Sequence, residues 1–181
     1  MLTVKWGIAA AAALALAAGA AADDRRNHDA AASRTLAVGG LVKAPLELKV
    51  EALREMPATM IDEIVMCSPR RMKYVGKDYR GVLLRDLLDA AEVDDEALHS
   101  RNTIYVVASA TDGYQVMFSL QELRNSPIGD QVLVYYEKNG APLGTDQGLI
   151  ALVSAGDYQR CHRHVRWLNR IEVHRHASAA P

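Results

Sequence analysis

"LKVEALREMPATMIDEIVMCSPRR", residues 48–71, places a short helical pattern between two strand patterns and ends the second strand at a cysteine. Alternating apolar residues at its start predict the first strand. "EALREMP" predicts a short helix that Pro57 closes, because the residue before a proline is pushed out of the helical region. "IDEIVMC" predicts the second strand, which carries Cys67 at its end. The stretch therefore predicts a cysteine held at the end of an ordered strand.

Length and composition predict one globular domain with a substantial core. The chain has 181 residues, of which 50% are hydrophobic and 24% are charged, and its formal net charge is -1. This length is ample for a single core. Basic and acidic residues are interspersed, so no basic block is available to attract nucleic acid, and we expect no nucleic-acid partner.

The patterns along the rest of the domain contain more strands than helices. "TLAVGGLVKAPLELKV" (35–50) predicts two strands around a turn, and "YRGVLLRDLLDAAEV" (79–93) predicts an amphipathic helix. "TIYVVASA" followed by Asp112-Gly113 and "YQVMF" predicts a hairpin. Ser119 and Glu122 have the spacing of a capping box, which predicts a helix start.

Three further strands are predicted towards the C-terminus, in "QVLVYYEKNGAPL" (131–143), "LIALVSAGD" (149–157) and "VRWLNRIEV" (165–173). Helical and strand patterns do not alternate regularly. The fold class that follows is α+β, with mixed sheets and a few short helices.

The N-terminus has the pattern of a signal peptide over residues 1–22. Lys5 supplies the positive charge, Ile8–Ala18 is apolar, and Ala20–Ala22 fits the small-residue cleavage rule, with cleavage before Asp23. The apolar run is short for a membrane span, so we expect a periplasmic or secreted protein with no stable membrane insertion after cleavage. The run has no preceding Arg-Arg pair, which favours general export of an unfolded chain.

The remaining boundaries follow from composition. "DDRRNHDAAASRT" is polar and aperiodic, so residues 23–35 are interpreted as a flexible tether. The domain is predicted over residues 36–174, and residues 175–181 are predicted to be a disordered tail.

The two cysteines, Cys67 and Cys161, allow two interpretations. In an oxidising compartment they could form a disulfide, which would stabilise the domain by about 4 kcal/mol in the chain-entropy model. The alternative is two buried free thiols. Sequence spacing does not decide between them.

"QRCHRHVRWLNRIEVHRH" (159–176) concentrates histidines near the C-terminus. On an extended strand His162 and His164 share one face, and His174 and His176 form a similar pair. Such pairs could bind zinc or copper. The alternative is exposed histidines beside the C-terminal tail, because no further ligand stands at a spacing that completes a familiar site.

Four stretches together resemble the molybdopterin-binding domain of the sulfite oxidase family, in its compact bacterial secreted form. They are "LKVEALREMPATMIDEIVMCSPRR", "YRGVLLRDLLDAAEV", "ASATDGYQVMFSLQEL" and "GAPLGTDQGLIALVSAGDYQRCHRHVRWLNRIEV". The likeness covers nearly all of residues 36–173. It implies a sulfite-oxidase-like fold and a molybdenum-molybdopterin cofactor.

The resemblance also implies roles for individual residues. Cys67 would be the catalytic molybdenum ligand, with Arg70 or Arg71 beside it, and Arg163 and Arg166 would grip the pterin or its phosphate. A thiolate is a soft metal ligand, and arginine offers planar, permanently charged donors for phosphate.

Departures from the family pattern leave two functions open. "CSPRR" lacks the asparagine usual after the cysteine, and Gln147-Gly148 stands where the family has His-Gly, with no arginine in the "LIALV" that follows. The first hypothesis is a molybdopterin-dependent oxidoreductase with an incomplete cofactor site, served by a redox partner protein. The second is a periplasmic binding module on the same fold, without the cofactor, that binds a small anionic ligand or a protein partner.

Overall fold

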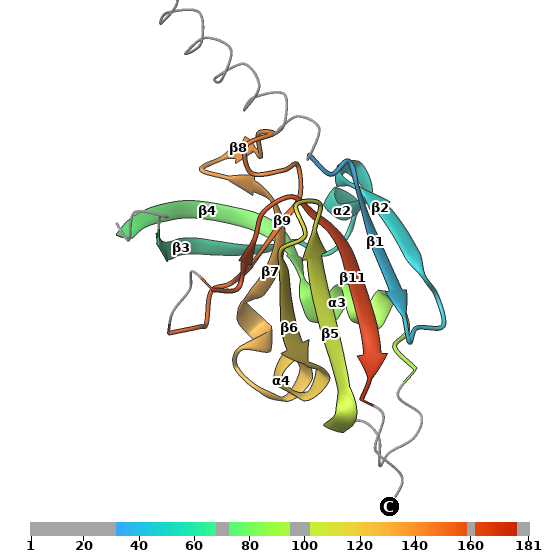
Figure 1. Cartoon of the computed structure of the whole chain (residues 1–181). Helices are drawn as coiled ribbons and strands as arrows, with labels where there is room; N and C mark the ends of the chain where they lie inside the picture. Colours follow the sequence, from blue (N-terminus) through green and yellow to red (C-terminus); the bar gives the residue numbers. More distant parts are fainter. Residues whose placement is uncertain (1–31, 68–72, 95–101, 159–161, 177–181) are drawn as a thin grey trace, which may run out of the picture.

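The computed structural model describes residues 32–67, 73–94, 102–158 and 162–176. They form two sheets packed face to face, with short helices beside and between them (Figure 1). This arrangement is α+β with mixed sheets and few helices, as the sequence predicts.

The first sheet has five strands. Their order is β2 (Leu46–Lys49), β1 (Thr35–Gly40), β11 (Leu168–Arg175), β5 (Ile104–Ala110) and β6 (Gln115–Ser119). β1 and β2 are antiparallel, and the β5–β6 pair forms around Asp112-Gly113, so both predicted turns are confirmed. β1 also pairs in parallel with β11, which joins the two ends of the domain.

The second sheet has six strands. Five follow the order β10 (His164–Val165), β9 (Ala151–Ser154), β7 (Val132–Lys138), β4 (Lys73–Leu83) and β3 (Thr59–Cys67), and the short β8 (Ala141–Pro142) pairs with β7. The part of β3 and β4 that lies beyond β7 extends as a long hairpin (Figure 1).

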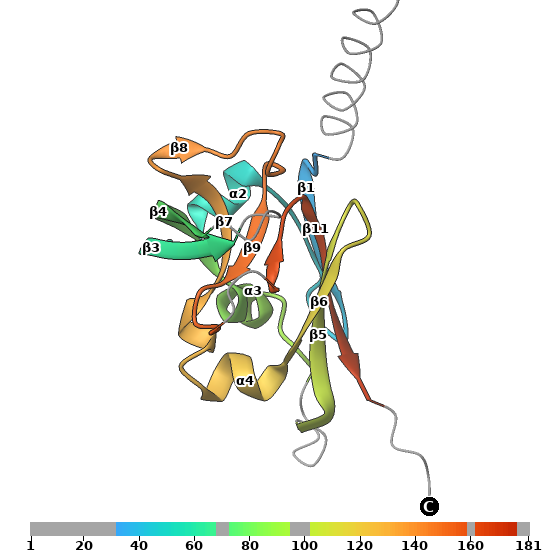
Figure 2. The same cartoon turned by 60° about the vertical axis from the view of Figure 1, so that its left-hand side comes forward.

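The helices are short, and two of them match the predicted starts. α2 (Val50–Glu55) follows β2 directly, and α4 (Leu120–Asn125) begins with the predicted capping box between Ser119 and Glu122. α3 (Leu84–Ala90) lies between the two sheets, and a 3-10 turn, η2 (Gly129–Gln131), precedes β7 (Figure 2).

The helix predicted over residues 79–93 is wrong in its first part. Residues 79–83 belong to β4, and the helix begins only at Leu84. A Cβ at Gly81 would lie 2.1 Å from the carbonyl oxygen of Val134, so glycine lets β4 approach β7 closely at this point. Strand pairing therefore overrides the helical periodicity.

The single strand predicted over residues 165–173 is confirmed from Leu168 onward but is wrong in its first part. β10 ends at Val165 and β11 begins at Leu168, in the other sheet. Trp167 between them has a φ of 52°, the left-handed conformation, which breaks the extended backbone. The chain therefore crosses from one sheet to the other at Arg166 and Trp167.

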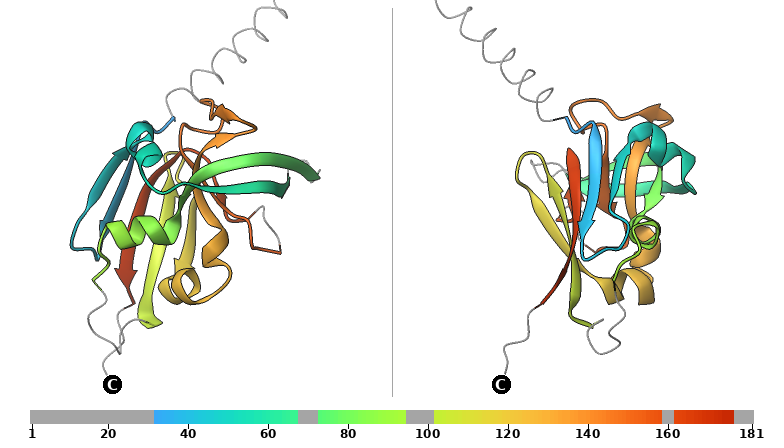
Figure 3. Two further views of the ribbon diagram at one scale, coloured as in Figure 1. Left: turned by 180° about the vertical axis from the view of Figure 1, so that it is seen from behind. Right: turned by 90° about the vertical axis from the view of Figure 1, so that its right-hand side faces the viewer.

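Two apolar clusters lie on opposite faces of the six-stranded sheet. The larger one fills the space between the sheets and includes α3, whereas the smaller one includes Tyr79, Leu133 and Tyr135 on the outer face. The alternation along β7 produces this division, because Tyr135 points to the smaller cluster and Tyr136 to the larger. Figure 3 shows the two layers from the side.

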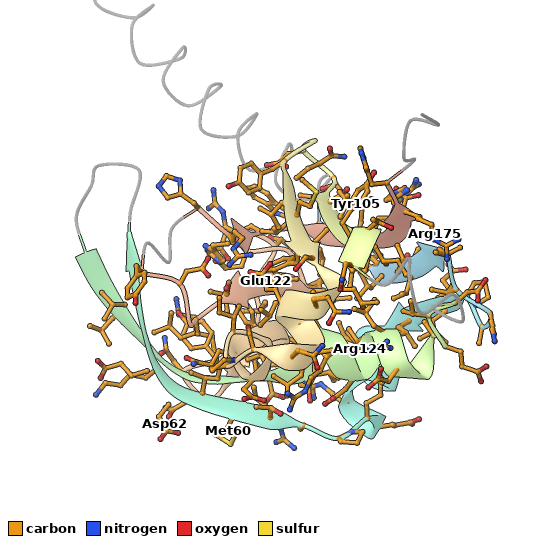
Figure 4. The ribbon with its side chains drawn as sticks, turned by 90° about the horizontal axis from the view of Figure 1, so that it is seen from below. Met60, Asp62, Tyr105, Glu122, Arg124 and Arg175 are labelled. Carbon is orange, nitrogen blue, oxygen red and sulfur yellow. The ribbon has the colours of Figure 1, made fainter. Side chains whose placement is uncertain are left out.

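The outer faces of the two layers point in opposite directions. In the view from below, Tyr105 on β5 lies on one side and Met60 and Asp62 on β3 lie on the other (Figure 4). Across the described residues, none of the helices is both long and apolar enough to span a membrane.

Candidate functional site

The end of β3 places Cys67 at the free end of the β3–β4 hairpin. Its backbone lies opposite Lys73 in that hairpin. Arg70 and Arg71 lie outside the described residues, as does Cys161, and the proposed Cys67–Cys161 disulfide therefore lies outside them too. In Figures 1 and 4 this end of the hairpin is on the same side of the molecule as the described residues that lead into β10.

Arg163, which immediately precedes β10, is held by two carboxylates. Its Nε donates to Asp157 Oδ2 at 2.7 Å, and its Nη1 donates to Glu122 Oε1 at 2.7 Å. The guanidinium also stacks over the Phe118 ring, with 4.4 Å between its Cζ and the ring centroid. The hydrogen bonds from Arg163 to Asp157 raise the pKa of Arg163, so this side chain carries a permanent charge that is already paired.

Arg166 is in a different environment. It is exposed, and its guanidinium stacks on the Trp167 ring at 4.7 Å. Within the described ranges no carboxylate pairs with it. Trp167 in turn donates from Nε1 to the Thr145 carbonyl oxygen at 2.7 Å and from its backbone nitrogen to the Gln147 carbonyl oxygen at 2.9 Å. Arg166 is therefore a cation on a fixed aromatic platform.

His164 lies between these two arginines in sequence and faces the outer apolar cluster. Its Nε2 is 2.9 Å from the Tyr135 hydroxyl, and the two rings are stacked with centroids 6.2 Å apart. Burial, and then the positive charges of Arg166 and Lys138, lower the pKa of His164 to about 4. The imidazole is therefore neutral at pH 7.

Lys138 adds a second cation to this face. Its ammonium lies 5.3 Å from the centroid of Tyr79, and Tyr79 packs edge-on against Tyr135 with centroids 5.1 Å apart. Burial lowers the pKa of Lys138, although the nearby Asp146 opposes that shift. The outer face of the six-stranded sheet thus combines a neutral histidine, buried tyrosines, and the side chains of Lys138 and Arg166. We refer to Tyr135, Lys138, His164 and Arg166 as the basic face.

The C-terminal histidines are arranged differently. The His174 ring stacks on Tyr105 with centroids 5.4 Å apart, and its Nε2 is 3.9 Å from a carboxylate oxygen of Glu172. In the part of the chain that the structure describes, no three His, Cys, Asp or Glu side chains come together as a group that could hold a metal ion.

Sequence reasoning missed four residues of this region: Glu122, Tyr135, Lys138 and Asp157. The capping box identifies Glu122 only as a helix-start residue, and "VLVYYEK" identifies Tyr135 only as one of two alternating strand tyrosines. The ion pairs with Arg163 span 6 and 41 residues of sequence, so no local spacing rule could have found both.

The family model described as "Oxidoreductase molybdopterin binding domain" matches residues 23–181. The chain belongs to the oxidoreductase molybdopterin-binding domain family. Among curated proteins no sequence match is found.

A solved structure supports the same fold for this family member. The sulfane dehydrogenase SoxCD from Paracoccus pantotrophus aligns with a TM-score of 0.61 and 21% sequence identity. The alignment covers 77% of the present chain but 37% of that chain, so the two share a fold over about a third of the longer protein. At this identity the likeness concerns the fold alone.

The described residues fit a phosphate-bearing pterin at one predicted arginine and not at the other. Among the described residues no carboxylate pairs with Arg166, which stacks on Trp167, whereas Arg163 donates to Asp157 and Glu122. A molybdopterin site in this domain would therefore use Arg166, and not both Arg163 and Arg166 as the sequence predicts.

Proposed function

We propose that this chain is an exported oxidoreductase domain that binds a molybdenum pterin on the side of the molecule where β3 ends and β10 begins. When bound, such a group supplies oxygen-atom or electron transfer to a substrate. Family membership supports the class of cofactor, and the geometry described above supports the side of the molecule.

In this proposal the residues of the chain have separate roles. Cys67 provides a thiolate for molybdenum, with Arg70 or Arg71 beside it, as the resemblance implies. Arg166 binds the phosphate of the pterin, because a planar guanidinium offers paired donors to phosphate oxygens. His164 stays neutral and presents a ring N–H or a lone pair, without adding charge to the site.

The observation that carries the proposal is the state of Arg166. It is an exposed guanidinium on the Trp167 ring, beside a neutral histidine, and the described residues provide it with no carboxylate. A phosphate would gain a charge-assisted contact there without having to displace an existing ion pair.

Metal and pterin analysis tests the proposal directly. Protein purified from a host that makes molybdopterin should contain about one molybdenum and one pterin per chain. Cys67→Ser should lose the molybdenum while keeping the wild-type circular dichroism spectrum, and Arg166→Gln should lose pterin. A wild-type protein without either component would contradict the proposal.

The proposed export has its own test. The N-terminal residue of protein recovered from the periplasm should be Asp23, as the signal pattern of residues 1–22 predicts. Full-length protein that stays in the cytoplasm would contradict this part. An exported oxidoreductase also needs a redox partner protein to accept or supply electrons.

The second candidate is a binding module without the cofactor, which binds an anionic ligand or a protein partner. The observation that favours it is the paired state of Arg163, which removes one of the predicted phosphate contacts. This candidate predicts phosphate-sensitive ligand binding by protein that contains neither molybdenum nor pterin.

A further inference from the structure

We propose that Arg163 is a structural clamp that ties the chain after β9 to α4, and that of the two described arginines Arg163 and Arg166 it is Arg166 that meets an anionic group. The second half of this inference rests on the proposed function. The first half stands on the ion pairs within the described chain.

Every nitrogen of the Arg163 guanidinium is engaged. Nε and Nη2 both donate to the carboxylate of Asp157, and Nη1 donates to Glu122 at 2.7 Å. Phe118 covers one face of the group, and the side chain is 21% exposed. These contacts use three of the five N–H donors, so a phosphate would have to compete with two carboxylates for the same guanidinium.

Both carboxylates are held independently of Arg163. Asp157 Oδ1 also accepts from the hydroxyl of Ser154 at 2.8 Å, and Ser154 is fully buried. Glu122 accepts from the Ser119 backbone nitrogen at 3.1 Å through its other oxygen, as part of the capping box. Neither acid is therefore free to swing away and release the arginine (Figure 4 shows Glu122 at the start of α4).

The charge balance of this group opposes anion binding. One guanidinium faces two carboxylates, which leaves a net charge of -1 if all three groups are ionised. Burial raises the pKa of Asp157, but hydrogen bonds from Arg163 and Ser154 outweigh it and hold this pKa below its ordinary value, so Asp157 is ionised at neutral pH. A phosphate placed beside this trio would meet like charge. Arg166, three residues later, has no described carboxylate to neutralise it.

The clamp also holds together three parts of the chain. It connects the turn after β9, the start of α4 and the residue immediately before His164. Arg163 therefore fixes the entry into β10, from which His164 and Arg166 follow. It is a structural residue rather than a ligand-binding one, because Arg166 is held separately by its stacking on Trp167.

The two arginines form a matched pair for experiment. The probe is inorganic pyrophosphate, titrated into protein made in a host that cannot synthesise molybdopterin. Arg163→Gln should lower Tm by about 5 °C and leave the pyrophosphate Kd within about twofold. Arg166→Gln should leave Tm unchanged and weaken pyrophosphate binding by about tenfold, the loss of one charge-assisted contact.

Two further variants examine the geometry of the clamp. Asp157→Asn should lower Tm without tightening pyrophosphate binding more than about threefold, since Arg163 is still held by Glu122. Arg163→Lys keeps the charge but not the planar fork, and should recover less than half of the Tm lost in Arg163→Gln.

The opposite pattern would overturn the inference. Loss of pyrophosphate binding in Arg163→Gln at unchanged Tm would make Arg163 a ligand residue, and an absence of pyrophosphate binding in the wild type would remove the role given to Arg166. Failure of the proposed function would be detected in a different measurement, as an absence of pterin in protein purified from a host that makes molybdopterin. The Tm comparison between the two arginine variants is unaffected by that outcome.

Discussion

The hydroxyl of Tyr135 lies 2.9 Å from Nε2 of His164, whereas the hydroxyl of the next residue, Tyr136, is buried without a hydrogen-bond partner among the described residues. Both tyrosines are almost fully buried, at 0% and 1% exposure. They point to opposite faces of β7, so the same substitution has different consequences at adjacent positions.

Removing the two hydroxyls should therefore give opposite results. Tyr135→Phe leaves the His164 nitrogen without its partner and should lower the free energy of unfolding by about 1–3 kcal/mol. Tyr136→Phe removes a buried polar atom that has no described partner, and should be neutral or stabilising. Urea denaturation of both variants measures the difference, and equal losses in the two would contradict it.

The environment of His164 predicts a pH-dependent stability. Its pKa falls from 6.5 to about 4 because of burial and then the charges of Arg166 and Lys138. Between those values the unfolded chain binds the proton and the folded chain does not, so stability falls as the pH drops from 6.5 to 4. The loss over the whole window is about 3 kcal/mol.

The pH dependence can be assigned with two histidine variants. His164→Gln should flatten the plot of unfolding free energy against pH between 4 and 6.5. His174→Gln, at a more exposed position on β11, is the control variant. An unchanged slope in His164→Gln would rule out the assignment.

Asp157 predicts a second acid-sensitive contribution at lower pH. Its pKa lies below the ordinary value because the hydrogen bonds from Arg163 and Ser154 exceed the opposing effect of burial. The stability that it provides is present above the unfolded pKa of 3.8 and is lost as the pH falls through the lower folded value. Asp157→Asn should therefore show a smaller loss of stability below pH 4 than the wild type does, in thermal melts across that range.

Gly148 should be intolerant of a side chain. Its φ is +73°, and a Cβ would lie 2.5 Å from the Cα of Trp167. Because this is a backbone atom, it cannot be displaced without moving the chain. Gly148→Ala should lower the free energy of unfolding by more than about 2 kcal/mol. It should also disturb the Trp167 platform under Arg166, so its pyrophosphate affinity is expected to fall.

Gly113 is the control for this substitution. Its φ is +87°, but a Cβ there would meet nothing within 4 Å. Gly113→Ala should therefore lower the free energy of unfolding only by the cost of a left-handed backbone, about 1 kcal/mol. Equal losses in the two alanine variants would show that the contact with Trp167 is not what constrains Gly148.

Much of the fold could be predicted from local patterns. Alternation located the strands on either side of α2, Asp112-Gly113 located a hairpin, and the spacing of Ser119 and Glu122 located a helix start. These signals depend on residues a few positions apart, which the sequence displays directly. The errors occurred where distant strands intervened, because Gly81 packs against β7 and Trp167 interrupts the final strand.

The sequence by itself determined the α+β class, the order of most elements and the resemblance to a molybdopterin-binding domain. Only the tertiary structure decided which cations are paired and which are not. Arg163 and Arg166 are three residues apart and chemically identical, yet Asp157 and Glu122 reach only the first of them. Charge pairing depends on distances across the fold, and Glu122 comes to Arg163 from 41 residues away because α4 packs beside the entry into β10.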